Sequence, residues 1–234
     1  MNELLGLAIE GHGGMRRWRE ISRLRAVLSI TGEIWKEHRK DGLLDNVTIE
    51  AETRDQRLTI APFPGAGRYA TWEPHRRTIE TAEGVPIAER RDVPAAPAWD
   101  DLDVAYLAAE ACWTSFTAPF LFARPDFTTA ELGPWVEDGQ IWQRLRVTYP
   151  ACVATHGREQ VCYFDGSGFL CRVDFTADIL GGARFAQYPT DYCEFDGILV
   201  PTRRLTFVRD EEGAPDLGAT VVAVDVEDVM FLSA

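Results

Sequence analysis

Residues 23–35 read RLRAVLSITGEIW, and the first part of this stretch alternates between apolar and polar side chains. Successive side chains of a β-strand point to opposite faces, so the alternation predicts a strand with one buried and one solvated face. Val27 departs from the pattern because it falls on the polar side. The residues expected on the buried face are Leu24, Ala26, Leu28 and Ile30.

The same period of two recurs further along the chain. Residues 46–54, NVTIEAETR, repeat it, and weaker strand candidates follow between residues 57 and 91. In the C-terminal half, aspartate–glycine pairs at 138–139, 165–166 and 196–197 separate strand-like runs. This dipeptide suits the tight turns of β-hairpins. We therefore expect about ten or eleven strands.

Residues 99–116, WDDLDVAYLAAEACWTSF, predict the longest helix. Three aspartates lie near its start, where the helix dipole favours negative charge, and Pro119 ends it. A second helix, near the N-terminus, is broken by the glycines at positions 11, 13 and 14. The apolar side chains that recur at helical spacing in the long helix are Leu102, Tyr106, Ala109, Trp113 and Phe116.

The order of strands, helix and strands predicts an α+β fold. We expect one large curled antiparallel sheet, an open half β-barrel, wrapped around the central helix and accompanied by the broken N-terminal helix, because sheets of this size twist and curl. The proline-containing stretch at residues 90–99 is interpreted as a loop inside a single domain spanning residues 1–234.

Two hairpins give testable pairings. A turn centred on Asp138-Gly139 places Trp135 opposite Trp142. A turn centred on residues 166–167 places Cys162 opposite Cys171.

Composition excludes several classes of partner. The formal net charge is -13, which disfavours binding to nucleic acid and to anionic membrane surfaces. No apolar run approaches the ~18 residues of a membrane-spanning helix. The N-terminal residues lack the basic start and the apolar run of a signal peptide, so we expect a cytoplasmic protein whose five cysteines are reduced.

No motif assembles a catalytic centre or a metal site. The four histidines are widely separated and no Cys-x-x-Cys occurs, so neither a metal nor a cofactor is expected. His156 is the best candidate for an acid or base, as a histidine near a carboxylate. Arg203 and Arg204 alternate across a strand, and whichever faces inward would be an anchor for a ligand carboxylate.

Three stretches carry a resemblance to a known family. Residues 12–30 (HGGMRRWREISRLRAVLSI), 162–175 (CYFDGSGFLCRVDF) and 192–207 (YCEFDGILVPTRRLTF) resemble the LolA/LolB-type family of bacterial lipoprotein carriers. The resemblance implies an unclosed antiparallel barrel over helices, whose concavity holds acyl chains in the carriers. Residues 60–130 carry no matching motif, and there is no secretion signal or lipobox cysteine near the start. A periplasmic lipoprotein role is therefore not expected, and no site residue is carried over.

Three functional hypotheses remain. The first is a protein that binds a hydrophobic or amphipathic small molecule, such as a lipid, in the concavity of the open barrel. The second is an enzyme of small-molecule metabolism that uses the same cavity, with His156 or a buried carboxylate such as Asp174 as the acid or base. The third is a structural or partner-binding protein without a pocket. The candidate ligand-binding residues are Tyr106, Trp113, Phe116, Trp142, Tyr149, Tyr163 and Phe175, subject to the face on which each strand residue points.

Overall fold

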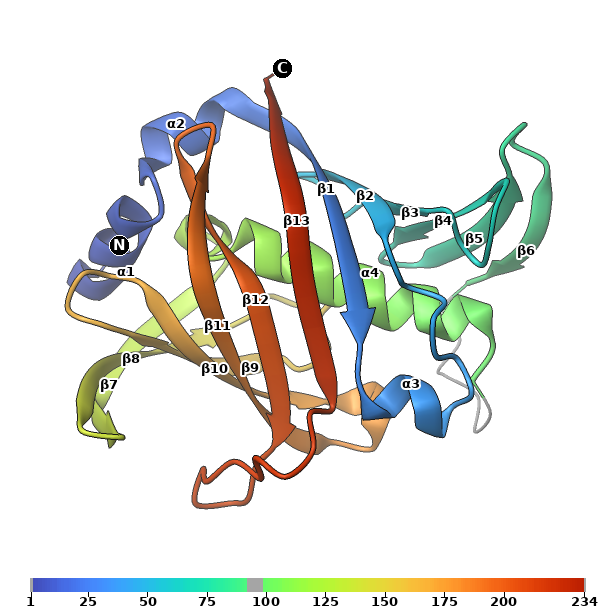
Figure 1. The fold of residues 1–234 in the computed structure, drawn as a ribbon. Helices are drawn as coiled ribbons and strands as arrows, with labels where there is room; N and C mark the ends of the chain where they lie inside the picture. The colour runs from blue at the N-terminus through green and yellow to red at the C-terminus, as the bar shows by residue number, and fades with distance from the viewer. Residues whose placement is uncertain (1, 92–98, 234) are drawn as a thin grey trace.

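A computed structural model describes residues 2–91 and 99–233 of the chain, and its ribbon is shown in Figure 1. Its helices are α1 (Glu3–Gly11), α2 (Gly14–Glu20), α3 (Glu33–Glu37) and α4 (Asp101–Thr117), with 3-10 turns at Phe120–Ala123 and Asp178–Leu180.

The strands of the described chain form one antiparallel sheet of thirteen strands. Their spatial order is β6-β5-β4-β3-β2-β1-β13-β12-β11-β10-β9-β8-β7. The first and the last strand of the described chain are therefore neighbours at the middle of the sheet, where β1 pairs with β13. The bounds are β1 (Ile21–Thr31), β2 (Val47–Glu52), β3 (Leu58–Ala61), β4 (Arg68–Glu73), β5 (Arg76–Thr81), β6 (Pro86–Arg90), β7 (Thr128–Glu137), β8 (Gln140–Thr148), β9 (Glu159–Phe164), β10 (Leu170–Ala177), β11 (Ala183–Phe195), β12 (Ile198–Val208) and β13 (Val222–Ser233).

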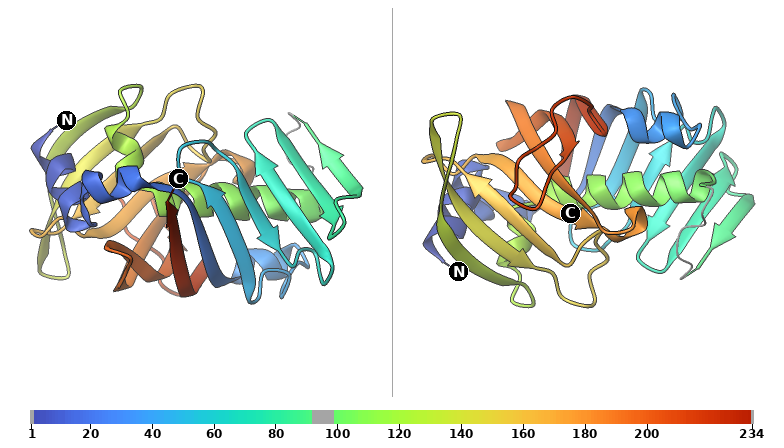
Figure 2. Two further views of the ribbon diagram at one scale, coloured as in Figure 1. Left: turned by 90° about the horizontal axis from the view of Figure 1, so that it is seen from above. Right: turned by 90° about the horizontal axis from the view of Figure 1, so that it is seen from below.

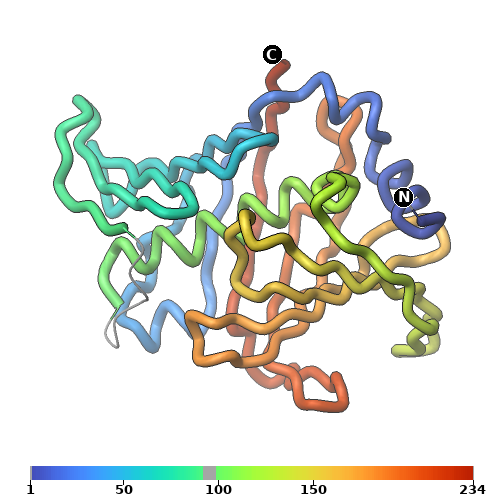
Figure 3. The backbone as a smooth tube through the Cα atoms, turned by 180° about the vertical axis from the view of Figure 1, so that it is seen from behind, coloured from blue at the N-terminus to red at the C-terminus, as the bar shows by residue number. Residues whose placement is uncertain are grey.

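The sheet curls around α4, which crosses its concave side (Figures 2 and 3). A reciprocal capping box between Asp100 and Asp103 fixes the start of this helix. Near its other end, the indole Nε1 of Trp113 donates hydrogen bonds to the carbonyls of Glu52 and Asp55, at 2.8 and 3.1 Å. These bonds attach α4 to the turn between β2 and β3.

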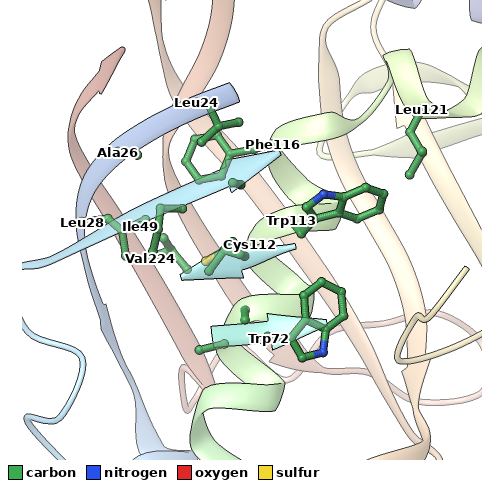
Figure 4. Packing of buried hydrophobic residues seen from close by; sticks show 14 of the residues in the cluster. Leu24, Ala26, Leu28, Ile49, Trp72, Cys112, Trp113, Phe116, Leu121 and Val224 are labelled. Carbon is green, nitrogen blue, oxygen red and sulfur yellow. The ribbon is translucent and has the colours of Figure 1, made fainter. Parts of the chain in front are cut away.

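The core lies between α4 and the concave face. Figure 4 shows Trp113 above Trp72 of β4, with Phe116 toward Leu24 of β1. Leu24, Ala26, Leu28 and Ile30 are all buried, as the alternation in β1 predicts. The α+β half-barrel around a central helix is confirmed.

Two details differ from the sequence-based expectation. The sheet has thirteen strands rather than ten or eleven, because all the weak strand candidates between residues 57 and 91 form strands, β3 to β6. Most of the expected loop at residues 90–99 lies outside the described residues, which leave out 92–98.

The two predicted hairpin pairings have different outcomes. Trp135 pairs with Trp142, as expected. The pairing of Cys162 with Cys171 is wrong, because Cys162 lies opposite Val173. Two features shift the register: the Asp165 carboxylate accepts the backbone N–H groups of both Ser167 and Phe169, which makes a longer turn, and β10 has an irregularity between Leu170 and Arg172, at Cys171.

Gly13 sets the angle between α1 and α2. Its φ is +114°, and a Cβ there would lie 2.2 Å from the carbonyl oxygen of Gly197, in the turn between β11 and β12. We expect Gly13→Ala to destabilise the fold by more than about 1 kcal/mol, through both strain and collision. Urea unfolding measures the loss. Gly139→Ala is the matched control, since Gly139 also has a positive φ (+77°) but no atom within 4 Å of the added Cβ. Equal losses in the two variants would contradict the contact argument.

Candidate functional site

A two-lobed cavity lies between α4 and the concave face of the sheet. The lobes have volumes of about 80 and about 70 Å³. The first reaches α1 and the start of β12, and the second reaches β1, α3 and β13. The residues that line both lobes are Ala111, Ser115, Phe116, His156, Phe175, Gln187 and Arg204.

Helix α4 leaves this space open because two of its three side chains at the junction are small. Ala111 and Ser115 lie one turn apart on the same helical face and line both lobes. The opposite wall comes from three adjacent strands, with Phe175 on β10, Gln187 on β11 and Arg204 on β12. Most of the lining is apolar, so the few polar groups stand out.

Arg204 is the most unusual of these polar groups. Its side chain is buried (3% exposed), and its guanidinium carbon lies 5.1 Å from the centre of the Phe116 ring. Within residues 2–91 and 99–233, no side chain forms an ion pair with it and no group accepts a hydrogen bond from it. Burial lowers the pKa of Arg204. Its neighbour Arg203 is exposed and lies 3.8 Å from Asp225.

His156 forms a buried pair with Glu110 of α4. The histidine Nε2 lies 2.6 Å from a Glu110 carboxylate oxygen and 3.1 Å from the carbonyl oxygen of Leu107. Thr114 donates a hydrogen bond to the other Glu110 oxygen at 3.1 Å. Burial alone lowers the pKa of His156, but the charge of Glu110 and these contacts outweigh it and raise the pKa.

His12 contributes a neutral polar group to the first lobe. Its Nδ1 lies 2.7 Å from the carbonyl oxygen of Ala8, at the end of α1. Burial lowers the pKa of His12, so its imidazole is uncharged at neutral pH. Gln187 is held by a 3.2 Å hydrogen bond to the hydroxyl of Thr206.

The seven sequence-predicted ligand-binding residues fall into three groups. Phe116 and Phe175 line both lobes. Tyr106 and Tyr149 do not line the cavity, but each contacts a residue that does. The Tyr106 ring is 5.8 Å from the His156 ring, and the Tyr149 hydroxyl donates a hydrogen bond to Gln160 at 3.2 Å.

The remaining three lie away from the cavity. Trp113 packs in the core against β2–β4. Trp142 and Tyr163 lie on the convex face of the sheet, where their rings are 6.3 Å apart. Tyr163 follows Cys162, which lines the first lobe. Because successive side chains of a strand point to opposite faces, the Tyr163 side chain lies on the convex face.

Asp174 also lies on the convex face, next to cavity-lining Val173 and Phe175. It binds the guanidinium of Arg172 at 2.6 and 3.0 Å. Its carboxylate therefore faces away from the hollow.

Sequence reasoning missed Glu110 and left the direction of Arg204 open. Glu110 was visible as the one charged residue within an apolar helical run, LAAEACW at residues 107–113. Arg204 gave no such signal, because its face depends on the register of β12.

Within residues 2–91 and 99–233, no group of three or more histidine, cysteine, aspartate or glutamate side chains gathers at metal-binding distance. Over the same residues, no helix combines the length and the apolar character that crossing a bilayer requires.

Comparison with known proteins shows likeness at the level of structure. No protein family and no curated protein matches the chain by sequence. A LolA superfamily protein from Nitrosomonas europaea is 11% identical with a TM-score of 0.53, covering 97% of this chain and 93% of its own. A domain described as an outer membrane lipoprotein-sorting protein from Vibrio parahaemolyticus is 11% identical with a TM-score of 0.54, covering 98% and 93%.

A third solved structure has the same arrangement. A DUF1329 family protein from Desulfovibrio piger is 12% identical with a TM-score of 0.55, covering 97% of this chain and 91% of its own. Identities this low concern the fold alone. The curled open sheet, its central helix and these three structures together show that the chain has a LolA-like fold.

Proposed function

We propose that residues 1–234 form a single half-barrel domain that binds a hydrophobic or amphipathic small molecule in the two-lobed cavity. The observation that carries the proposal is the apolar hollow between α4 and the concave sheet, with a few polar groups at its junction. Ligand sites commonly combine an apolar lining with a small number of orienting polar groups. The likeness to a lipoprotein-sorting domain supports a lipid-like ligand.

A second candidate is an enzyme that uses the same cavity. The observation in its favour is the buried pair of His156 and Glu110, 2.6 Å apart, which borders the first lobe. Under this hypothesis, His156 would transfer a proton to or from a bound substrate. His156→Gln would abolish turnover while leaving ligand binding within a few-fold of wild type. The third hypothesis, a pocketless structural protein, is disfavoured by the cavity.

We propose the cytoplasm as the compartment. All five cysteines are free, and Cys112 and Cys162 are buried with thiol pKa values raised to about 12 by burial. Unpaired core cysteines are typical of reducing compartments.

Filling the junction tests the proposed site. Ala111→Phe places a ring between the lobes and is expected to weaken binding of 2-naphthol, a small neutral aromatic dye, at least about tenfold. Dye fluorescence titration measures the affinity, and native mass spectrometry of the purified wild type looks for a small molecule that leaves on denaturation.

Ala219→Phe is the control, because Ala219 is exposed in the loop before β13. It should bind the dye as the wild type does. Equal binding by Ala111→Phe and wild type would place the dye outside the cavity and contradict the proposal.

A further inference from the structure

We infer that the ligand is an apolar carboxylic acid whose carboxylate pairs with Arg204 at the junction of the two lobes. This inference rests on the proposed function and specifies the ligand's head group. The chain has 37 acidic and 24 basic residues, yet among the described residues no acidic side chain pairs with the buried guanidinium of Arg204.

Arg204 cannot become neutral by losing its proton. The guanidinium stays charged in proteins, and a buried charge without a counter-ion is costly. The Phe116 ring at 5.1 Å offers a cation–π contact, which compensates only part of that cost. A guest anion in the lobes would supply both the missing charge and the missing hydrogen-bond acceptors.

The other ionisable groups around the cavity leave the charge of Arg204 unopposed. Glu110 is the one carboxylate in the lining of either lobe, and His156 holds it at 2.6 Å. His12 has a lowered pKa, and Cys112 and Cys162 have thiol pKa values of about 12, so these three groups are neutral. The cavity thus presents one net positive charge.

One positive charge matches a carboxylate better than a phosphate monoester. A carboxylate carries one negative charge and accepts two parallel hydrogen bonds from a guanidinium. A phosphate monoester carries about 1.5 to 2 negative charges at neutral pH and would leave excess negative charge in an apolar cavity.

The lobes limit the size of the apolar part. A buried water molecule needs roughly 10–15 Å³ of cavity volume. Lobes of about 80 and about 70 Å³ therefore each hold only a handful of water-sized groups. A medium-length acyl chain or a small aromatic acid fits this space. A lipid with several long chains does not.

The test compares ligands that differ only in the head group. We expect wild-type protein to bind decanoate at least about tenfold more tightly than decanol in calorimetric titration, because hydrogen bonds to charged groups are the strong ones. Arg204→Met should remove this preference, and Arg204→Lys should keep part of it. Arg203→Met is the matched control on the exposed face of the same strand, and it should leave the preference unchanged.

Each other outcome is decisive. Binding of decanol with no preference for decanoate would overturn the carboxylate inference and leave the proposed cavity function standing. Tighter binding of decyl phosphate would also overturn it. Failure of every one of these ligands and of 2-naphthol to bind would overturn both proposals.

Stability of Arg204→Met gives an independent check on folding. Removing an unpaired buried charge should raise the melting temperature by at least about 2 °C. A fall would show that Arg204 is required for the fold and would overturn the inference.

Discussion

Replacing Arg172 by methionine is expected to destabilise the protein by about 3–5 kcal/mol, the usual cost of breaking a buried ion pair. Arg172 is fully buried (0% exposed) on the convex face, where it bridges Glu137 and Asp174 at 2.5 and 2.6 Å. It also donates to the Tyr188 hydroxyl and to the carbonyl of Gly213. Methionine would leave both carboxylates without their main partner.

Chemical unfolding in urea measures this loss. Arg144→Met is the matched control, because the Arg144 guanidinium lies 5.4 Å from the same Trp135 ring that Arg172 contacts at 5.6 Å, but it forms no ion pair within the described chain. We expect the control to cost under about 1 kcal/mol. Similar losses in the two variants would show that ring contacts, not charge pairing, account for the effect. Arg172 and Arg204 are both buried, yet methionine is expected to change stability in opposite directions.

Glu110→Gln is expected to cost about 3 kcal/mol near pH 6 and progressively less at higher pH. Glutamine keeps the size of Glu110 and a contact for Thr114 but removes the charge that faces His156. The raised pKa of His156 means that the folded state holds its proton above pH 6.5, where the unfolded state releases it. The pair's contribution is therefore complete below pH 6.5 and is lost as the pH rises through the folded-state pKa.

Unfolding curves between pH 5.5 and 9 measure this change, and His156→Gln should flatten the same pH dependence. Glu159→Gln is the control, because Glu159 is exposed and lies 3.9 Å from Arg146. Its effect should be small at every pH. A loss in Glu110→Gln that stayed constant with pH would contradict the charge pairing of Glu110 with His156.

The fold could be predicted largely because β1 and α4 carry strong periodic signals. Leu24, Ala26 and Leu28 mark the buried face of β1 without ambiguity, and Pro119 ends the helix region. The short strands β3 and β6 were only weak candidates, because four or five residues contain few alternations. Their place in the sheet follows from neighbouring strands rather than from their own residues.

The site was harder to predict, because whether a residue lines the cavity depends on the register of several strands. Phe175 and Tyr163 were both assigned to the cavity from alternation, but only Phe175 borders it. Asp165-Gly166 indicates a turn, but neither the length of that turn nor the irregularity at Cys171, which together shift β9 against β10, has a distinctive sequence signal. The pair of Glu110 and His156 joins residues far apart in the chain, and no local pattern connects them.

The central position of β13 has a consequence for how the protein is made. This strand pairs with β1 on one side and β12 on the other, so a nascent chain without residues 222–233 has two separate half-sheets. Each half then carries an unpaired edge strand that can associate with other chains. The wall of the cavity is completed only after these residues leave the ribosome, and a ligand has no complete cavity to enter before that moment.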